Sequence, residues 1–409
     1  MIERIWVRNF RMLANNRVDL VPFAVLVGRN ATGKSTLMSA IRFISNALSG
    51  GVARAVDLAL DHSAAGFHDL CFRDSEPLQF AVQVRCPKGV YRYELEIGPD
   101  SLNCPAVTRE NLFRLPDDCV GRDLQRSLFG DDEADEVVHQ AAPRGFRWRR
   151  IAGKTAEGKD YFQDERTDWN NTFRFGPDRP ALGSLPEDVD RFPGALAVRN
   201  FLREGVILVE LDSHALRMPS PPRSESHLVR DGSNLAAAAA ALERDDKAAY
   251  RQWVNHVSDA IEGLKDVVTW ERPEDKHLVL RARFAGTHDV AVPSWLLSDG
   301  TLRLMALSLL AYSEREDRGG VYLIEEPENG LHPLAIQSVH SALSQMTTMQ
   351  VFVATHSPVF LANTSLDQAL VFARSPQGSA AVRRGREVAD LEKWQTQVQL
   401  SDVFETGVL

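Results

Sequence analysis

The sequence predicts an α/β protein, built as a mixed sheet with flanking helices and carrying an inserted irregular α+β region. Three observations predict this class. The continuously apolar run 23–27 precedes a glycine-containing loop and a helical pattern over 37–48. Two further apolar runs, 321–324 and 351–354, are typical of strands buried on both faces. Between about 99 and 204 the chain is rich in Pro, Gly, Asp and Arg and loses its periodicity, as insertions with long loops do.

This change in composition divides the chain into three parts. The length of 409 residues is compatible with two or three domains, or with one large domain that carries an insertion. We assign residues 1–98 and 205–409 to the two halves of one body and residues 99–204 to an insertion or lid region.

The composition narrows the function classes. The chain is 44% hydrophobic and 25% charged with a net charge of -9, so any nucleic-acid contact needs a local basic face. The cysteines form no C-x-x-C pair, which argues against zinc and for reduced, mostly buried thiols. No signal peptide and no apolar run of membrane-spanning length is visible, so a cytoplasmic protein without a membrane partner is expected. The cysteines are Cys71, Cys86, Cys104 and Cys119.

The remaining elements follow from periodicity and turn residues. Alternation over 5–10 predicts a strand, and two strand patterns separated by Pro87-Lys88-Gly89 predict a hairpin. An alanine-rich run after Asp231-Gly232-Ser233-Asn234 predicts a helix. The other expected strands are 205–212, 267–271, 277–284 and 289–293, and the other expected helices are 250–264, 296–312, 334–345 and a short one from about 390.

The loop Gly28–Ser35 fits G-x-x-x-x-G-K-[ST] at every fixed position. Glycines let the backbone turn its N–H groups around phosphate oxygens, and the helix that follows adds its positive dipole end. Lys34 is expected to place its ammonium on the β- and γ-phosphates, and Ser35 to offer its hydroxyl to Mg²⁺. With a buried strand before it and a helix after it, this loop predicts nucleotide binding.

Two adjacent carboxylates, Glu325 and Glu326, end a buried apolar strand. Carboxylates at such a place are costly unless a cation or water meets them. Beside a phosphate loop, Glu325 is expected near Mg²⁺, through water, and Glu326 is expected to orient or deprotonate the attacking water. The alternative is a pair of strand-end glutamates bonded to a neighbouring arginine.

Two polar sites in the second half add to this pattern. Ser298 and Gly300 stand at the start of a predicted helix, a second anion-binding arrangement that suggests a nucleotide held between two chains. The alternative is an ordinary helix cap made by Ser298 or Asp299. His356 ends a buried strand and is placed to sense a terminal phosphate; the alternative is a histidine satisfied at a strand end.

Taken in order, these motifs resemble the ATP-binding-cassette ATPase plan, in the branch that contains RecF, the SMC proteins and the OLD-family ATPases. The motifs are closest to OLD-like ATPases, whose second acidic motif also has Glu-Glu-Pro-Glu followed by Leu-His-Pro. The 53 residues after His356 hold no Asp-x-Asp, so the Toprim nuclease module of OLD nucleases is not expected. The resemblance rests on Asn9–Arg11, 28–36, 231–243, 297–303, 323–333, 354–358 and the tail 403–409.

The resemblance implies a P-loop ABC-ATPase head with specific residue roles. The phosphate loop, or Walker A motif, is matched by Gly28, Asn30, Gly33, Lys34, Ser35 and Thr36. The signature that completes the partner chain's site is matched by Ser298, Gly300 and Arg303. The catalytic glutamate is matched by Glu326, the switch histidine by His356, and the metal side by Ser35 and Glu325.

Three positions depart from the family pattern or leave it open. Glu325 stands where transporters and SMC proteins have aspartate, which favours metal contact through water. His332 stands where many of these ATPases have the aspartate of the D-loop, so communication between the two sites is expected to differ. The glutamine loop is either Gln79 or Gln83.

The preferred function is therefore an ATPase that uses ATP and Mg²⁺, dimerises through ATP and regulates a separately encoded effector. The resemblance implies that this effector is a nuclease in bacterial defence against phage. One alternative is a RecF-like DNA-repair ATPase that binds DNA through the arginines of 143–150; against it, that stretch is also typical of an edge strand paired with the acidic run 131–136. A nucleotide-binding scaffold without turnover is a third possibility.

Overall fold

The computed structural model describes residues 1–61, 65–74, 76–116, 137–139, 148–154, 158–286, 290–314 and 319–388. The chain forms two compact units. The first consists of residues 1–21, 29–206 and 372–383, and the second of residues 22–28, 207–371 and 384–409. The expected short helix from about 390 and the tail 403–409 lie outside the described residues.

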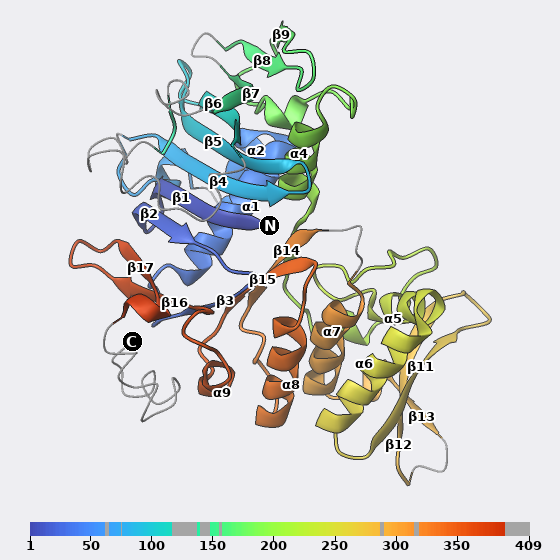
Figure 1. Ribbon diagram of the computed structural model, residues 1–409. Helices are drawn as coiled ribbons and strands as arrows, with labels where there is room; N and C mark the ends of the chain where they lie inside the picture. Colours follow the sequence, from blue (N-terminus) through green and yellow to red (C-terminus); the bar gives the residue numbers. More distant parts are fainter. Residues whose placement is uncertain are drawn as a thin grey trace. The chain divides into compact units, whose positions relative to one another are not determined.

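The first unit is built on an eight-stranded sheet in the order β2-β1-β4-β5-β6-β7-β8-β9 (Figure 1). Every neighbouring pair is antiparallel, and the predicted hairpin around Pro87-Lys88-Gly89 is confirmed. The strands are β1 (Ile2–Phe10), β2 (Leu13–Asp19), β4 (Leu78–Cys86), β5 (Gly89–Pro99), β6 (Pro105–Leu115), β7 (Arg149–Lys154), β8 (Asp160–Gln163) and β9 (Asn170–Phe173). The helices are α1 (Lys34–Gly50), α2 (Val52–Ala59) and α4 (Pro193–Glu204).

The region expected to be irregular continues this sheet through β6 to β9. Strands β6, β7 and β8 lack a clean apolar pattern because buried charges replace apolar residues on them. Lys154 and Asp160 are fully buried and paired at 2.5 Å. Glu110 is also buried and accepts a hydrogen bond from Tyr93 at 2.9 Å. Burial raises the pKa of Glu110 to about 7. Buried charges are tolerated when they are paired or hydrogen-bonded, but a hydrophobicity pattern does not predict them.

The arginine-rich stretch that suggested DNA binding is partly described, and its strand is not an edge. Strand β7 lies between β6 and β8. Arg149 donates to the carbonyl oxygens of Asp164 and Glu165 at 2.7 and 3.0 Å. Arg150 donates to the carbonyl oxygen of Glu110 at 3.1 Å. These guanidinium groups pack within the unit. Residues 140–147 and the acidic run 131–136 lie outside the described part of the chain.

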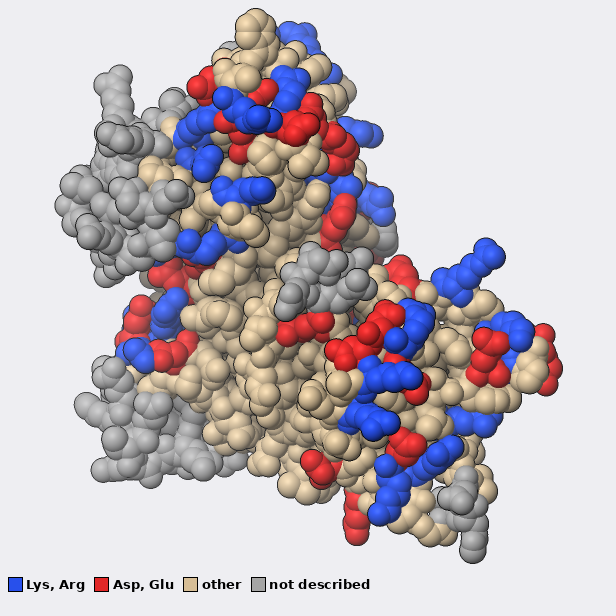
Figure 2. All heavy atoms as spheres, turned by 45° about the vertical axis from the view of Figure 1, so that its right-hand side comes forward, with Lys and Arg blue, Asp and Glu red and all other residues tan. Residues whose placement is uncertain are grey.

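Charge is mixed over the visible face of each unit. In Figure 2, Lys and Arg side chains alternate with Asp and Glu side chains, and the described residues form no extended basic face in that view. This distribution agrees with the net charge of -9.

The second unit is built on a six-stranded sheet in the order β10-β14-β15-β3-β16-β17. Its centre is parallel: β15 pairs with both β14 and β3, and β3 also pairs with β16. Strand β3, blue in Figure 1, thus joins strands more than 290 residues away, as its continuously buried sequence predicts. The strands are β3 (Phe23–Val27), β10 (Val206–Val209), β14 (Gly320–Glu325), β15 (Met349–Ala354), β16 (Ala369–Arg374) and β17 (Ala380–Arg384), and part of the β16–β17 hairpin groups with the first unit.

A smaller antiparallel sheet, β11-β12-β13, and several helices complete the described part of the second unit. The strands are β11 (Leu264–Glu271), β12 (Leu278–Phe284) and β13 (Ala291–Pro293). The helices are α5 (Leu235–Asp245), α6 (Lys247–Ala260), α7 (Asp299–Tyr312), α8 (Pro333–Ser344) and α9 (Pro358–Ala362).

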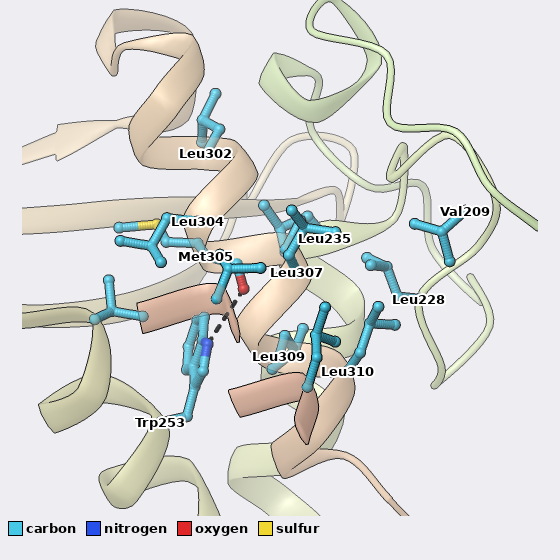
Figure 3. Packing of buried hydrophobic residues seen from close by; sticks show 14 of the residues in the cluster. Val209, Leu228, Leu235, Trp253, Leu302, Leu304, Met305, Leu307, Leu309 and Leu310 are labelled. Carbon is cyan, nitrogen blue, oxygen red and sulfur yellow. Dashed lines mark hydrogen bonds between the residues drawn. The ribbon is translucent and has the colours of Figure 1, made fainter. Parts of the chain in front are cut away.

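Helix α7 is the centre of this unit's core. It is apolar on almost every side, and its leucines pack among α5, α6 and α8 (Figure 3). Trp253 of α6 is fully buried and donates its indole N–H to the Met305 carbonyl oxygen and the Ser308 hydroxyl, at 3.2 and 3.0 Å. A helix held in this way presents its first turn in a fixed position.

The cysteine prediction needs a correction. Cys71 and Cys86 are half-buried and Cys104 is exposed, and all three are free thiols, whereas Cys119 lies outside the described residues. Cys104 sits in the turn before β6, where side chains point to solvent. Within the described ranges, no helix is both long and apolar enough to span a bilayer.

Candidate active site

The loop after β3 has the backbone conformation that a phosphate cradle requires. Gly28, Ala31 and Gly33 have φ of 154°, 59° and 106°, so the loop turns repeatedly through conformations that favour glycine. At Gly33 a side chain is excluded for a second reason: a Cβ there would lie 2.8 Å from the Cβ of Ala380. The two fixed glycines of the motif are therefore required by the backbone itself.

Helix α1 begins at Lys34, directly behind this loop. Lys34 is buried, and its Nζ donates to the Arg29 carbonyl oxygen at 3.0 Å, which folds the lysine along its own loop. Ser35 is exposed in the first turn, Thr36 is buried, and Asn30 is exposed at the loop surface. The predicted strand, loop and helix thus follow one another as expected.

The second set of candidate residues lies where parallel strands end. Glu325, the last residue of β14, is in register with Ala354, the last of β15, and Ala354 is in register with Leu26 of β3. The carboxyl ends of these three strands therefore share one edge of the sheet. In open α/β sheets this edge is where ligands bind. Gly28 and Glu326 are the first residues after β3 and β14, and His356 is the second residue after β15.

Glu326 is held in a strained backbone conformation. Its φ is 45°, which costs a non-glycine residue free energy and is found mostly where function requires it. Its N–H donates to the Ala354 carbonyl oxygen at 2.8 Å, so β14 and β15 remain bonded past the last strand residue. The carboxylate Oε1 lies 3.8 Å from His356 Nε2, and both side chains are partly exposed.

Sequence reasoning missed two residues that organise this edge. Asn329 donates its side-chain amide to Glu326 Oε2 at 2.8 Å. Glu328 accepts three bonds at Oε1, from the Thr355 hydroxyl at 2.6 Å, the His356 N–H at 2.9 Å and the Ser357 N–H at 3.0 Å. The sequence signal that could have found Glu328 and Asn329 is their position shortly after Glu326, in the loop at the strand ends.

Ser298 is the helix cap that one alternative predicted. Its hydroxyl accepts from the Thr301 N–H at 3.1 Å, and the side chain is exposed at the start of α7. The ligand role of Ser298 stays a prediction, and it would use the same hydroxyl oxygen as the cap. Gly300 lies tightly against the loop that follows Glu326: a Cβ there would be 2.5 Å from the Gly330 carbonyl oxygen.

Two arginines fix the start of α7. Arg217 forms an ion pair with Asp299 and donates to the Leu297 carbonyl oxygen at 2.9 Å. Arg303 donates to the Leu211 carbonyl oxygen at 3.1 Å, and burial lowers its pKa. Arg303 is thus partly occupied in holding the helix. Just before Ser298, the side chains of Trp295 and Leu296 are 45% and 69% exposed.

The remaining candidates take ordinary structural positions. His332 caps α8, with Nδ1 accepting from the Leu334 N–H at 3.4 Å. Gln79 and Gln83 lie on β4 and donate to Glu96 and Glu3, at 2.7 and 2.9 Å. Both glutamines thus make cross-strand bonds, and the assignment of a glutamine loop stays a prediction.

Comparisons with known proteins agree with this architecture. The family described as "AAA domain, putative AbiEii toxin, Type IV TA system" matches residues 23–362, well over half of the chain. No curated protein matches this chain. An SMC head bound to the C-winged helix domain of ScpA is 17% identical with a TM-score of 0.51, over 93% of this chain and 97% of that one. An SMC head with an extended coiled coil, bound to the C-terminal domain of ScpA derived from Pyrococcus furiosus, is 14% identical with a TM-score of 0.50, over 97% and 99%. Such identities show a shared fold.

The chain has the fold of SMC head domains. This confirms the fold class predicted from the motifs. The chain itself belongs to the AbiEii-type AAA family, whose match begins at β3 and runs past His356. Closeness to the OLD-like ATPases within the branch of RecF and the SMC proteins stays a prediction.

Proposed function

We propose that this protein binds and hydrolyses ATP with Mg²⁺, dimerises around the nucleotide and uses that cycle to regulate an effector protein. The observation that carries the proposal is the shared edge of β3, β14 and β15, which leads into the phosphate loop and holds Glu326 within 3.8 Å of His356. A carboxylate facing an imidazole at the ligand edge of an α/β sheet suits hydrolysis better than a static scaffold.

The residues present fit a nucleoside triphosphate and its metal ion. The cradle around Gly33 excludes a Cβ, and Lys34 supplies a cation at the start of α1. The described residues contain no cluster of three or more His, Cys, Asp or Glu that could hold a metal ion. Mg²⁺ would therefore be held by phosphate oxygens together with the Ser35 hydroxyl and, through water, Glu325; all of these are the oxygen ligands it prefers. When bound, Mg²⁺ neutralises charge on the phosphates.

In this proposal Glu326 and His356 divide the chemistry. The Glu326 carboxylate orients the attacking water and accepts its proton, and the Asn329 amide keeps that carboxylate in place through Oε2. The His356 imidazole donates a hydrogen bond to the terminal phosphate, where negative charge is present throughout the reaction. Asn30 and Thr36 complete the phosphate loop.

Dimerisation is supported by the start of α7. Ser298 and Gly300 stand at an exposed helix N-terminus, a place suited to a second chain's phosphates. Trp295 and Leu296 are exposed directly beside it. Exposed aromatic and aliphatic side chains next to a polar anchor are typical of the core of an interface. Arg303 would support the signature by holding the start of α7 through its bond to the Leu211 carbonyl oxygen.

Regulation of a separately encoded effector rests on the relatives. The family description names a toxin of a type IV toxin–antitoxin system. The SMC heads of similar fold were solved with bound ScpA domains. We extend these relations to this chain and propose that it works with a nuclease effector in a two-protein system of bacterial defence. Nucleotide-dependent closure would be the signal that the effector senses.

The test is ATP turnover by the purified protein and by Glu326→Gln, with oligomeric state measured by light scattering. We expect the wild type to release phosphate, and the variant to bind ATP and form a stable dimer with little turnover. Binding without turnover in the wild type would favour the scaffold, and absence of ATP binding in both proteins would refute the proposal.

A further inference from the structure

Glu328 ties the loop after β14 to the loop after β15. One carboxylate oxygen, Oε1, accepts from the Thr355 hydroxyl, the His356 N–H and the Ser357 N–H, at 2.6, 2.9 and 3.0 Å. Bonds to an ionised acceptor are the stronger class. Three of them on consecutive residues fix the backbone that carries the His356 imidazole.

The opposite end of β15 carries the same device, which makes a natural comparison. Glu314 accepts from the Thr348 hydroxyl and N–H and the Met349 N–H at Oε1, between 2.8 and 3.0 Å, and from the Thr347 N–H at Oε2, 3.1 Å. Glu314 therefore holds the amino end of the strand, away from the ligand edge. Both glutamates brace β15. Of the two, Glu328 is the one that contacts the residues after the strand, at the edge where Glu326 lies.

The loop that carries Glu328 also contacts the start of α7. Gly300 approaches the Gly330 carbonyl oxygen so closely that no side chain fits between them. Glu328 is among the charges that raise the pKa of Arg303, against the larger effect of burial. Neither Glu328 Oε2 nor Arg303 Nε has a hydrogen-bond partner among the described residues, although both atoms are buried. Loop 326–331 thus lies against α7 on one side and holds the His356 loop on the other.

We propose that Glu328 is a positioning residue that sets the His356 loop relative to Glu326 and links that pair to the signature helix α7. The inference rests on the proposed ATPase function, because it assigns Glu328 a part in turnover. It differs from a purely structural brace, since movement of α7 at Gly300 would be transmitted through the loop to His356. Binding of a second chain at α7 would thereby reach the hydrolytic pair.

The first experiment compares Glu328→Met with Glu314→Met. Methionine has a similar length but no carboxylate oxygen, so each variant loses the same kind of brace. We expect Glu328→Met to lower kcat at least tenfold while KM for ATP changes less than threefold. Glu314→Met should lower Tm by a similar amount and leave kcat within twofold of wild type. Equal kcat in the two variants would overturn the proposal.

A milder variant keeps the test available should Glu328→Met not fold. Thr355→Val removes only the hydroxyl donor of the shortest bond and is expected to lower kcat three- to tenfold. A double mutant of Thr355→Val and Glu328→Met should show less than the product of the single effects, because both act through one bond. Fully multiplicative effects would contradict a shared role.

Hydrogen exchange separates this inference from the proposed function. In Glu328→Met the amides of His356 and Ser357 should exchange at least tenfold faster than in Glu314→Met. This measurement needs no turnover. If the wild type does not hydrolyse ATP, the proposed function fails but faster exchange still supports the brace. Unchanged exchange refutes the brace whatever the activity.

Discussion

The Glu326 carboxylate and the His356 imidazole face each other across 3.8 Å at the carboxyl ends of β14 and β15. The distance is too long for a hydrogen bond between them, so the structure presents both groups toward one space without joining them. Each is held by its backbone: Glu326 through the Ala354 carbonyl oxygen, and His356 through the Glu328 carboxylate. This arrangement suits the proposed hydrolysis, in which Glu326 acts on the water and His356 on the phosphate.

Replacing Glu326 by glutamine is therefore expected to lower ATP turnover by about 100-fold or more, the usual scale of a lost general base. Glutamine keeps the size of the side chain and the acceptor for Asn329, so binding of ATP should change less than threefold. Phosphate release and equilibrium binding measure the two quantities. Asp275→Asn, at an exposed turn after β11, is the control. Turnover above one tenth of wild type in Glu326→Gln would show that another group activates the water.

Replacing Lys34 by alanine should weaken ATP binding roughly 10- to 100-fold, the scale of one hydrogen bond to a charged group. In the structure its Nζ donates to the Arg29 carbonyl oxygen, so binding requires the lysine to exchange that neutral acceptor for a phosphate. Titration calorimetry measures the affinity. Lys88→Ala, in the exposed turn between β4 and β5, should leave it unchanged. Equal affinities for the two variants would place the nucleotide elsewhere.

The elements that the sequence predicted best are those with continuous apolar runs. Strands β3, β14 and β15 are buried along nearly their whole length, and their parallel pairing brings Glu326 and His356 to the edge where the motifs put them. Helix α7 was likewise evident from its leucines. In these cases the burial pattern and the local sequence agree, and single-sequence reasoning is sufficient.

The failures have a common physical cause. Strands β6, β7 and β8 bury Glu110, Lys154 and Asp160 as satisfied polar groups, and the alternation of these strands is lost in the sequence. Glu328 was overlooked for a related reason: its importance comes from bonds to Thr355 and His356, which are distant in sequence. Long-range polar contacts leave no local signal. They become visible only when the fold places their partners.

Trp295 offers a test of the interface next to Ser298. Truncating a buried interface tryptophan usually costs about 2 kcal/mol, roughly 30-fold in dissociation constant. Trp295→Ala in the Glu326→Gln background should weaken the ATP-dependent dimer by that factor, as measured by analytical ultracentrifugation. Trp270→Ala, on the small sheet of the same unit, should not. A dimer unaffected by Trp295→Ala would argue against the start of α7 as the interface.

His340 predicts how the stability of the second unit depends on pH. The imidazole is buried between the rings of Phe23 and Phe360, at centroid distances of 5.3 and 4.8 Å, and burial lowers its pKa to about 4. The unfolded value is about 6.5. The folded state therefore disfavours the protonated form, and its stabilising contribution is complete above pH 6.5 and is lost as pH falls toward 4. Between pH 7 and pH 4.5 this amounts to about 2 kcal/mol.

His340→Gln removes the titrating group, so the free energy of unfolding should fall less steeply between pH 7 and pH 4.5 than in the wild type. Urea unfolding at the two pH values measures the difference. The exposed His214 provides the matched control, because His214→Gln should keep the wild-type slope. The comparison of slopes cancels the carboxylates that both proteins share. If His340→Gln and His214→Gln lose stability in parallel on acidification, then His340 is not the group that couples the core between Phe23 and Phe360 to pH.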